Sequence, residues 1–155
     1  MLNPYAAATC PTGFDEFELF PEDDQPVRLA YVHATWLAEL GAVFEIVWAS
    51  GWGCRANALV GPILGVAGYD HVRFPPMPFE PGEKLPAVAS YVRDRSVAWL
   101  DDVVLPSMQR WAGERAAPTL LVAVDPAVGL TREHVDALVL WEGDLPGSRD
   151  PRRPG

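Results

Sequence analysis

Two apolar runs in the sequence end in side chains that could take part in phosphate or metal chemistry. One run is followed by Ser50 and Gly51, and another by Asp101 and Asp102. Adjacent carboxylates repel each other unless a cation lies between them and another group. Two hard oxygen donors with room for water suit Mg²⁺. A magnesium site is therefore one interpretation of the aspartate pair.

Each of these residues also has an ordinary structural interpretation. Two aspartates at the end of a strand commonly cap a helix or make a solvated turn, and Ser-Gly is common in turns. Lys84 precedes an expected helix and would by default be a solvated surface lysine. Taken singly, none of these residues establishes a functional site.

Apolar runs of strand length would hold these residues in place. Residues 43–49, 96–100 and 118–124 are almost continuously apolar, which is typical of strands buried on both faces, and residues 70–74 are a weaker candidate. Helical patterns alternate with these runs, at residues 29–40, 56–64, 87–93, 107–115 and 132–141.

This alternation predicts an α/β fold with a Rossmann-like parallel sheet and helices on both of its faces. In such a sheet, ligands bind outside the carboxyl ends of the strands. The serine and the two aspartates follow strands directly, so we expect them at that edge. Residues 2–25 look loop-like, the domain is expected to span residues 1–142, and residues 143–155 are expected to be disordered.

Composition limits the classes of function. The 155 residues are 49 % apolar and 21 % charged, as expected for one globular domain. The net charge of −9 argues against broad binding to nucleic acids or anionic membranes. No apolar run reaches the roughly 18 residues of a membrane span, and no secretory signal is evident. Cys10 and Cys54 lack the spacing of a zinc site and are expected to be free thiols in the cytoplasm, with a disulfide or reactive role as the alternative.

The order of the candidate residues resembles the haloacid dehalogenase (HAD) superfamily. A strand ending in a hydroxyl residue, then a lone lysine at a helix start, then a strand ending in two aspartates is similar to its second, third and fourth motifs. The local sequences WASGWG, KLPAV, VAWLDD and PTLLV resemble a group of small bacterial HAD-like proteins related to the HAD domains of RNA-repair proteins. The resemblance covers residues 2–141.

The resemblance implies a Mg²⁺-dependent phosphatase. Ser50 and the amide of Gly51 would bind the transferring phosphoryl group, and Lys84 would place a positive charge against it. Asp101 and Asp102 would hold Mg²⁺, directly or through water.

The first motif of the superfamily, an Asp-x-Asp-Gly that supplies the nucleophile and the general acid, is missing. In the family this motif is followed by Val-Leu-Asn-Pro, and the present sequence begins Met-Leu-Asn-Pro. We therefore expect the central strand and its aspartates upstream of Met1, and we expect the chain as given to be inactive. Without that strand, the strands at 43–49 and 96–100 would flank a gap. The alternative is a non-catalytic HAD-like binding or interaction module; Asp15 is a poor substitute nucleophile because it lacks the motif.

No segment is long enough for the cap domain that covers many HAD sites, because residues 2–25 and 66–83 leave room only for short loops. The open site would admit a small phosphate ester or a phosphorylated macromolecular end. Trp52 and Arg55 could border it, and Asp125 could join it or make a turn with the following proline. The histidines match no ligand spacing and are expected to lie on the surface or to pack helices: His33, His71 and His134.

Overall fold

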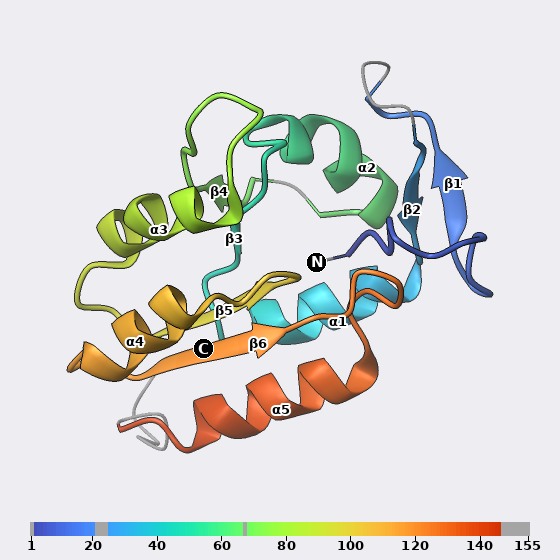
Figure 1. Cartoon of the computed structure of the whole chain (residues 1–155). Coiled ribbons are helices and arrows are strands. Elements are labelled where there is room, and N and C mark those ends of the chain that lie inside the picture. The colour runs from blue at the N-terminus through green and yellow to red at the C-terminus, as the bar shows by residue number, and fades with distance from the viewer. Residues whose placement is uncertain (1, 21–24, 67, 147–155) are drawn as a thin grey trace.

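A computed structural model describes residues 2–20, 25–66 and 68–146 of the protein. These residues form a mixed α/β structure (Figure 1) whose helices are α1 (Val32–Gly41), α2 (Gly61–Leu64), α3 (Lys84–Val92), α4 (Pro106–Glu114) and α5 (Arg132–Gly143). A π-helical turn (Ala56–Val60) leads into α2, and a 3₁₀ turn (Pro81–Glu83) leads into α3. None of the helices in the described ranges is long and apolar enough to cross a membrane.

Two parallel strand pairs confirm the α/β class. β3 (Val47–Trp48) pairs with β4 (Asp70–His71), and β5 (Val97–Asp101) pairs with β6 (Thr119–Ala123) over five residues. The two pairs belong to separate sheets. Within the described part of the chain, neither β3 nor β5 has a strand on its other edge.

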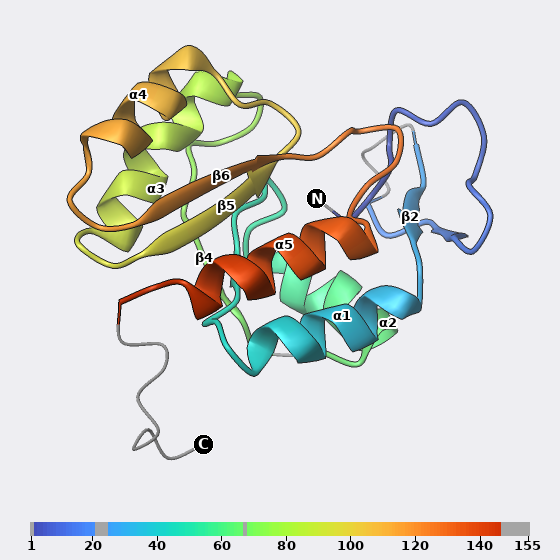
Figure 2. The ribbon, with the colours of Figure 1, turned by 90° about the horizontal axis from the view of Figure 1, so that it is seen from below.

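Helices cover the β5–β6 pair on both sides. Helices α3 and α4 lie on one side, and α1 and α5 lie on the other (Figures 1 and 2). The side chains of β5 alternate accordingly: Trp99 joins an apolar cluster with Val88 and Met108, and Leu100 joins a second cluster with Leu138. Such alternation is the period-two geometry of a strand that is buried on both faces.

The amino-terminal segment is not only loop, and this part of the sequence prediction was wrong. An antiparallel pair forms from β1 (Asp15–Phe17) and β2 (Val27–Leu29). Val27 and Leu29 are buried, with 2 % and 1 % of their surface exposed. This period-two burial places Leu29 in a strand, whereas the sequence pattern had assigned it to a helix; α1 begins three residues later.

The buried face of α1 also differs from the expected one. The apolar spacing that predicted this helix includes Val32 and Leu40 and would place both on the core side. His33, Leu37 and Leu40 are buried, whereas Val32 is 46 % exposed. His33 is 0 % exposed and contacts the rings of Phe14 and Trp36. It is therefore a helix-packing residue, one of the two roles expected for it.

The other boundaries shift more modestly. The strand expected at 43–49 is confined to β3, and the weak candidate at 70–74 is confined to β4. Helix α5 extends to Gly143, and the remainder of the expected disordered tail from residue 147, like Met1, lies outside the described residues.

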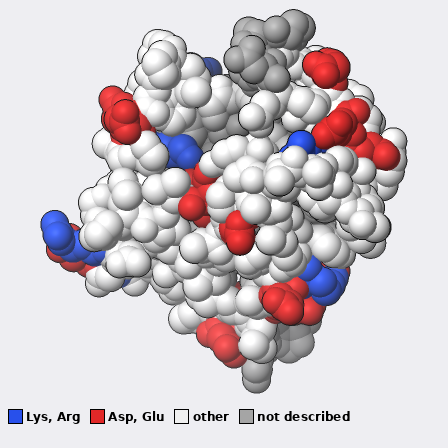
Figure 3. All heavy atoms as spheres, turned by 45° about the vertical axis from the view of Figure 1, so that its right-hand side comes forward, with Lys and Arg blue, Asp and Glu red and all other residues white. Residues whose placement is uncertain are grey.

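On one face of the molecule the charged side chains are scattered. On the face shown in Figure 3, single basic side chains lie among acidic ones, with no continuous basic surface. This face therefore lacks the clustered cations that phosphate backbones require.

We expect the protein to lose stability as the pH is lowered below neutrality, because of His33. Burial lowers the pKa of His33 from 6.5 to about 4, although the backbone of Leu130 acts in the opposite direction. The unfolded chain therefore takes up a proton first, so this contribution to stability is complete above pH 6.5 and is lost as the pH falls towards 4. Its full size is on the order of 3 kcal/mol.

Urea unfolding at several pH values between 7 and 4 tests this expectation. His33→Leu should flatten the dependence of the unfolding free energy on pH, whereas Leu37→Ala, at another buried position of α1, should lower stability and keep the wild-type slope. The same slope in wild type and His33→Leu would show that His33 does not control acid stability.

Candidate active site

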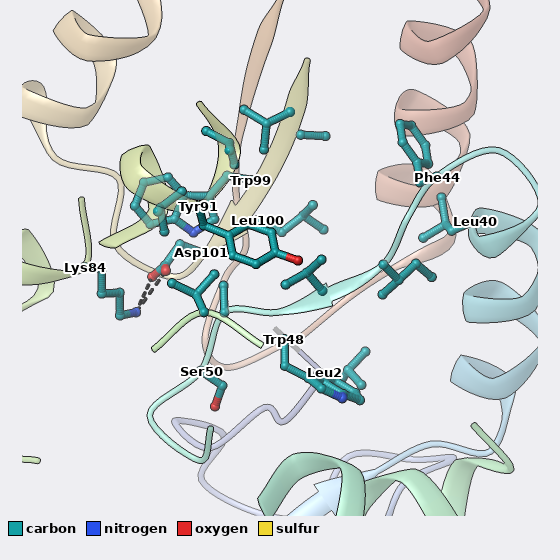
Figure 4. A pocket seen from close by; sticks show the side chains of 18 of the residues that line it. Leu2, Leu40, Phe44, Trp48, Ser50, Lys84, Tyr91, Trp99, Leu100 and Asp101 are labelled. Atoms are coloured by element: carbon teal, nitrogen blue, oxygen red, sulfur yellow. Dashed lines mark hydrogen bonds and ion pairs between the residues drawn. The ribbon is translucent and has the colours of Figure 1, made fainter. Parts of the chain in front are cut away.

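One cavity of about 460 Å³ brings the predicted site residues together. Ser50, Gly51, Lys84, Asp101 and Asp102 all contribute to its lining. Ser50, Lys84 and Asp101 are labelled in Figure 4. They come from the turn after β3, the first turn of α3 and the end of β5. The carboxyl ends of two strands thus meet the start of a helix at one side of the cavity, as expected for an α/β fold.

Partly buried Lys84 and buried Asp101 form an ion pair. The ammonium Nζ of Lys84 donates to both carboxylate oxygens of Asp101, each at 2.9 Å (Figure 4). The side chain of Lys84 is 16 % exposed and that of Asp101 only 4 %. Lys84 is the first residue of α3, and the 3₁₀ turn before it is closed by a bond from the Glu80 amide to the Glu83 carboxylate at 2.6 Å. Lys84 is therefore a structural partner of Asp101, not a solvated surface lysine.

Asp102 has a partner that the sequence did not suggest. The hydroxyl of Tyr5 donates to Asp102 Oδ2 at 2.6 Å, and this contact helps to raise the pKa of Tyr5 to about 12. Tyr5 lies in the segment that the sequence analysis treated as loop. No local pattern connects it with residues nearly a hundred positions away, so its role could not be predicted.

The two aspartates differ in their affinity for a proton. Burial raises the pKa of Asp101, against the opposing hydrogen bond and charge of Lys84. Burial acts in the same direction on Asp102, but hydrogen bonds from Tyr5 and Asp101 outweigh it, so the pKa of Asp102 is lowered. The repulsion expected between the two carboxylates is thus reduced by Lys84 on one side and by Tyr5 on the other.

Ser50 lies at the cavity but is occupied in a turn. Its Oγ accepts a hydrogen bond from the Trp52 amide at 3.2 Å, and its carbonyl accepts one from the Gly53 amide at 3.0 Å. In Figure 4 its hydroxyl is turned away from the Lys84–Asp101 pair. A side-chain rotation would be needed before this hydroxyl could meet a ligand held by Lys84.

Of the other residues considered for the site, Trp52 lines the cavity, whereas Arg55, Asp125 and Asp15 do not. Trp52 lines the cavity and stacks on Phe20, with ring centroids 4.7 Å apart. Arg55 lies over the ring of Phe20 at 4.6 Å, outside the lining. Asp125 is exposed and accepts a hydrogen bond from the Ala127 amide at 2.8 Å, so it makes a turn, one of the two roles expected for it. Asp15 opens β1, away from the lining.

The carboxylates fit Mg²⁺ in chemical type but supply only part of a coordination shell. Mg²⁺ takes six oxygen ligands and commonly keeps several waters beside one or two carboxylates and a substrate phosphate. Across the described ranges, no three side chains of His, Cys, Asp or Glu gather into a metal-binding group. Both oxygens of Asp101 contact Lys84, so direct metal binding there would require the ammonium to share or release one of them.

None of the protein-family models, curated proteins or solved structures compared with the chain matches it.

We expect Lys84→Met to destabilise the protein by roughly 3 kcal/mol, because removing one member of this ion pair leaves the buried charge of Asp101 uncompensated. The double variant Lys84→Met/Asp101→Asn should recover most of this loss, since no buried charge then remains. Arg132→Met, which breaks an exposed contact with Glu39, should have a much smaller effect.

Denaturant unfolding of the wild type, the two single Lys84 and Asp101 variants and the double variant gives the coupling free energy. Additive effects of Lys84→Met and Asp101→Asn would contradict a direct interaction between these side chains.

Proposed function

We propose that this chain forms most of a Mg²⁺-dependent phosphatase of the HAD type, whose aspartyl nucleophile is encoded upstream of Met1. One observation carries the proposal: the hydroxyl, lysine and paired carboxylates that match the second, third and fourth motifs all line the same cavity. They come from three elements separated by as many as 52 positions in the sequence (from 50 to 102), so local turn preferences do not account for their convergence.

Each residue has a role in this proposal. Lys84 holds a positive charge where the phosphoryl oxygens and the nucleophile would lie. The Ser50 hydroxyl, once rotated, and the Gly51 amide donate hydrogen bonds to the phosphoryl group, and glycine leaves the backbone open to a close approach. Asp101 and Asp102 would hold Mg²⁺, which when bound neutralises phosphate charge. Tyr5 keeps the carboxylate of Asp102 at the cavity.

The arrangement of the strands supports the finer fold assignment. A HAD-like three-layer domain with a missing central strand would leave two separate parallel pairs, and β3–β4 and β5–β6 are two parallel pairs in separate sheets. The site would have no cap domain. A phosphorylated small molecule or a macromolecular end would therefore reach it from solvent.

A second candidate is a non-catalytic binding module. The observation in its favour is that three polar side chains at the cavity already have partners within the protein: Asp101 is paired with Lys84, Asp102 with Tyr5, and the Ser50 oxygen with the Trp52 amide. These contacts form without substrate or metal.

The in-frame codons before Met1 provide the first test, because an apolar strand followed by Asp-x-Asp-Gly is expected there. A protein extended by these residues should hydrolyse an aryl phosphate in the presence of Mg²⁺, and the chain as given should not. If the extended protein and the chain as given hydrolyse the aryl phosphate at equal rates, an upstream nucleophile is not needed and the proposal is wrong.

Mg²⁺ binding provides the second test. In the extended protein, saturating Mg²⁺ should raise the melting temperature. At a Mg²⁺ concentration of 100 times the dissociation constant, the free energy of unfolding should increase by about 2.7 kcal/mol. Asp101→Asn should abolish the gain, because a neutral amide is a poorer ligand for a hard dication. Asp125→Asn, at the end of the neighbouring strand, should retain it. An unchanged gain in Asp101→Asn would show that the metal binds elsewhere.

A further inference from the structure

A short apolar loop lies against the turn that would hold phosphate. Residues 74–79, with the sequence FPPMPF, follow β4 and precede the 3₁₀ turn that leads to Lys84. In Figure 1 they form part of the lime-green arch between α3 and α2. Met77 of this loop contacts Gly51: a methyl group in place of the Gly51 hydrogen would lie 3.0 Å from Met77 Sδ, closer than most such contacts. The loop therefore meets the Ser50–Gly51 turn at the carboxyl end of β3.

The loop is anchored at its base and exposed at its tip. Phe74 packs against the apolar cluster that contains Val88 and Trp99, and its ring centroid lies 5.5 Å from that of Phe79. Both phenylalanines are half-buried, whereas Met77 between them is 65 % exposed. A single exposed apolar side chain is ordinary on a protein surface. Met77 differs in that it contacts the glycine whose amide would hold the phosphoryl group.

The geometry of phosphoryl transfer directs the leaving group towards this loop. The attacking and leaving oxygens lie roughly in line, on opposite sides of phosphorus. In the proposed function the nucleophile comes from an upstream strand between β3 and β5, so the leaving group would point outward, beyond the carboxyl ends of the strands. Loops that follow parallel strands lie beyond this edge, and residues 74–79 follow β4. The leaving group would therefore lie beside Met77.

The side chains around this position favour an apolar group. Residues 74–79 carry no charged side chain, and three of them are prolines, which lack an amide donor. On the other side of Gly51, the side chain of Trp52 lines the cavity. The thioether of methionine makes favourable contacts with aromatic rings. An uncharged aromatic group is the chemistry that this surface accommodates best.

Charges next to the loop oppose a nucleic-acid strand. Glu80 and Glu83 follow the loop directly, and both are exposed. Arg73 precedes it, but its charge acts on the neighbouring carboxylate of Asp70, whose pKa it helps to lower. Further phosphates of a nucleic acid would thus pass carboxylates where clustered cations are required.

We propose that Met77 determines the substrate of the phosphate site, by contacting the leaving group of a small phosphate monoester whose leaving group is apolar and aromatic. This inference rests on the proposed phosphatase function and narrows its substrate. It excludes the phosphorylated end of a nucleic acid as the preferred ligand.

Nuclear magnetic resonance of the chain as given, with ¹³C at the methionine methyl groups, tests this contact without requiring hydrolysis. The chain has three methionines, and Met77→Leu and Met108→Leu identify the two signals that matter. In the presence of Mg²⁺, 1-naphthyl phosphate should shift the methyl signal of Met77, because an aromatic ring alters the field at a neighbouring group. The signal of Met108, which is 1 % exposed, should not move. Partial burial of the ring should make binding about tenfold tighter than that of inorganic phosphate.

Two serine substitutions of exposed apolar residues provide a matched pair. Met77→Ser should lower the ratio of the affinities for 1-naphthyl phosphate and inorganic phosphate at least fivefold. Leu140→Ser should keep the wild-type ratio, because Leu140 is 70 % exposed on α5 and lies outside the cavity lining. The melting temperatures of both variants establish that they fold.

The outcomes separate this inference from the proposed function. If both ligands shift the Gly51 amide signal but bind equally, or if Met77→Ser keeps the wild-type ratio, the phosphate site stands and the role of Met77 is wrong. Tighter binding of a short 5′-phosphorylated oligonucleotide than of 1-naphthyl phosphate would also overturn the inference. If neither ligand shifts the Gly51 amide signal, the phosphate site itself is absent, and the proposed function fails together with the inference.

Discussion

The ion pair of Lys84 and Asp101 is the interaction on which the rest of the site depends. It connects the first turn of α3 to the end of β5, at the point where two strand pairs that share no hydrogen-bonded ladder approach each other. Apolar contacts between Val88 of α3 and Trp99 of β5 support the same junction. Apolar packing is not directional, whereas two hydrogen bonds from one ammonium to one carboxylate fix a position. The pair therefore sets where the carboxylates lie relative to the cavity.

The Lys84–Asp101 pair also determines what must change before Mg²⁺ or phosphate can bind. A buried carboxylate bound by an ammonium is stable without a metal, so Mg²⁺ and phosphate would have to redistribute contacts that already exist. The Ser50 side chain would also have to change its contacts, because its hydroxyl oxygen accepts a hydrogen bond from the Trp52 amide in its own turn. In the described structure the side chains of the site thus lie at the cavity but are bonded to groups of the protein itself. The phosphatase and binding-module proposals differ in whether a ligand replaces these contacts.

The sequence revealed the parts of the fold that local patterns encode. Continuous apolar runs marked β5 and β6 to within one or two residues, and the strand ends placed Ser50 and Asp101 at one cavity. The β1–β2 pair was missed because strands of three residues carry too little periodicity to register. The orientation of α1 was missed because its core face includes His33, a residue usually counted as polar. Tyr5 was missed because its contact with Asp102 spans 97 positions.

We propose that the aspartate pair at the end of β5 is a metal site beside Ser50 and Lys84. Nuclear magnetic resonance of the chain titrated with Mn²⁺ tests it directly, because Mn²⁺ prefers the same oxygen ligands as Mg²⁺ and broadens the signals of nearby nuclei. We expect the amide signals of Asp101, Asp102 and Ser50 to broaden first, while those of the turn at Asp125 persist. Broadening that begins at Asp125 or at other exposed acidic residues, with the Asp101 signal unchanged, would contradict it.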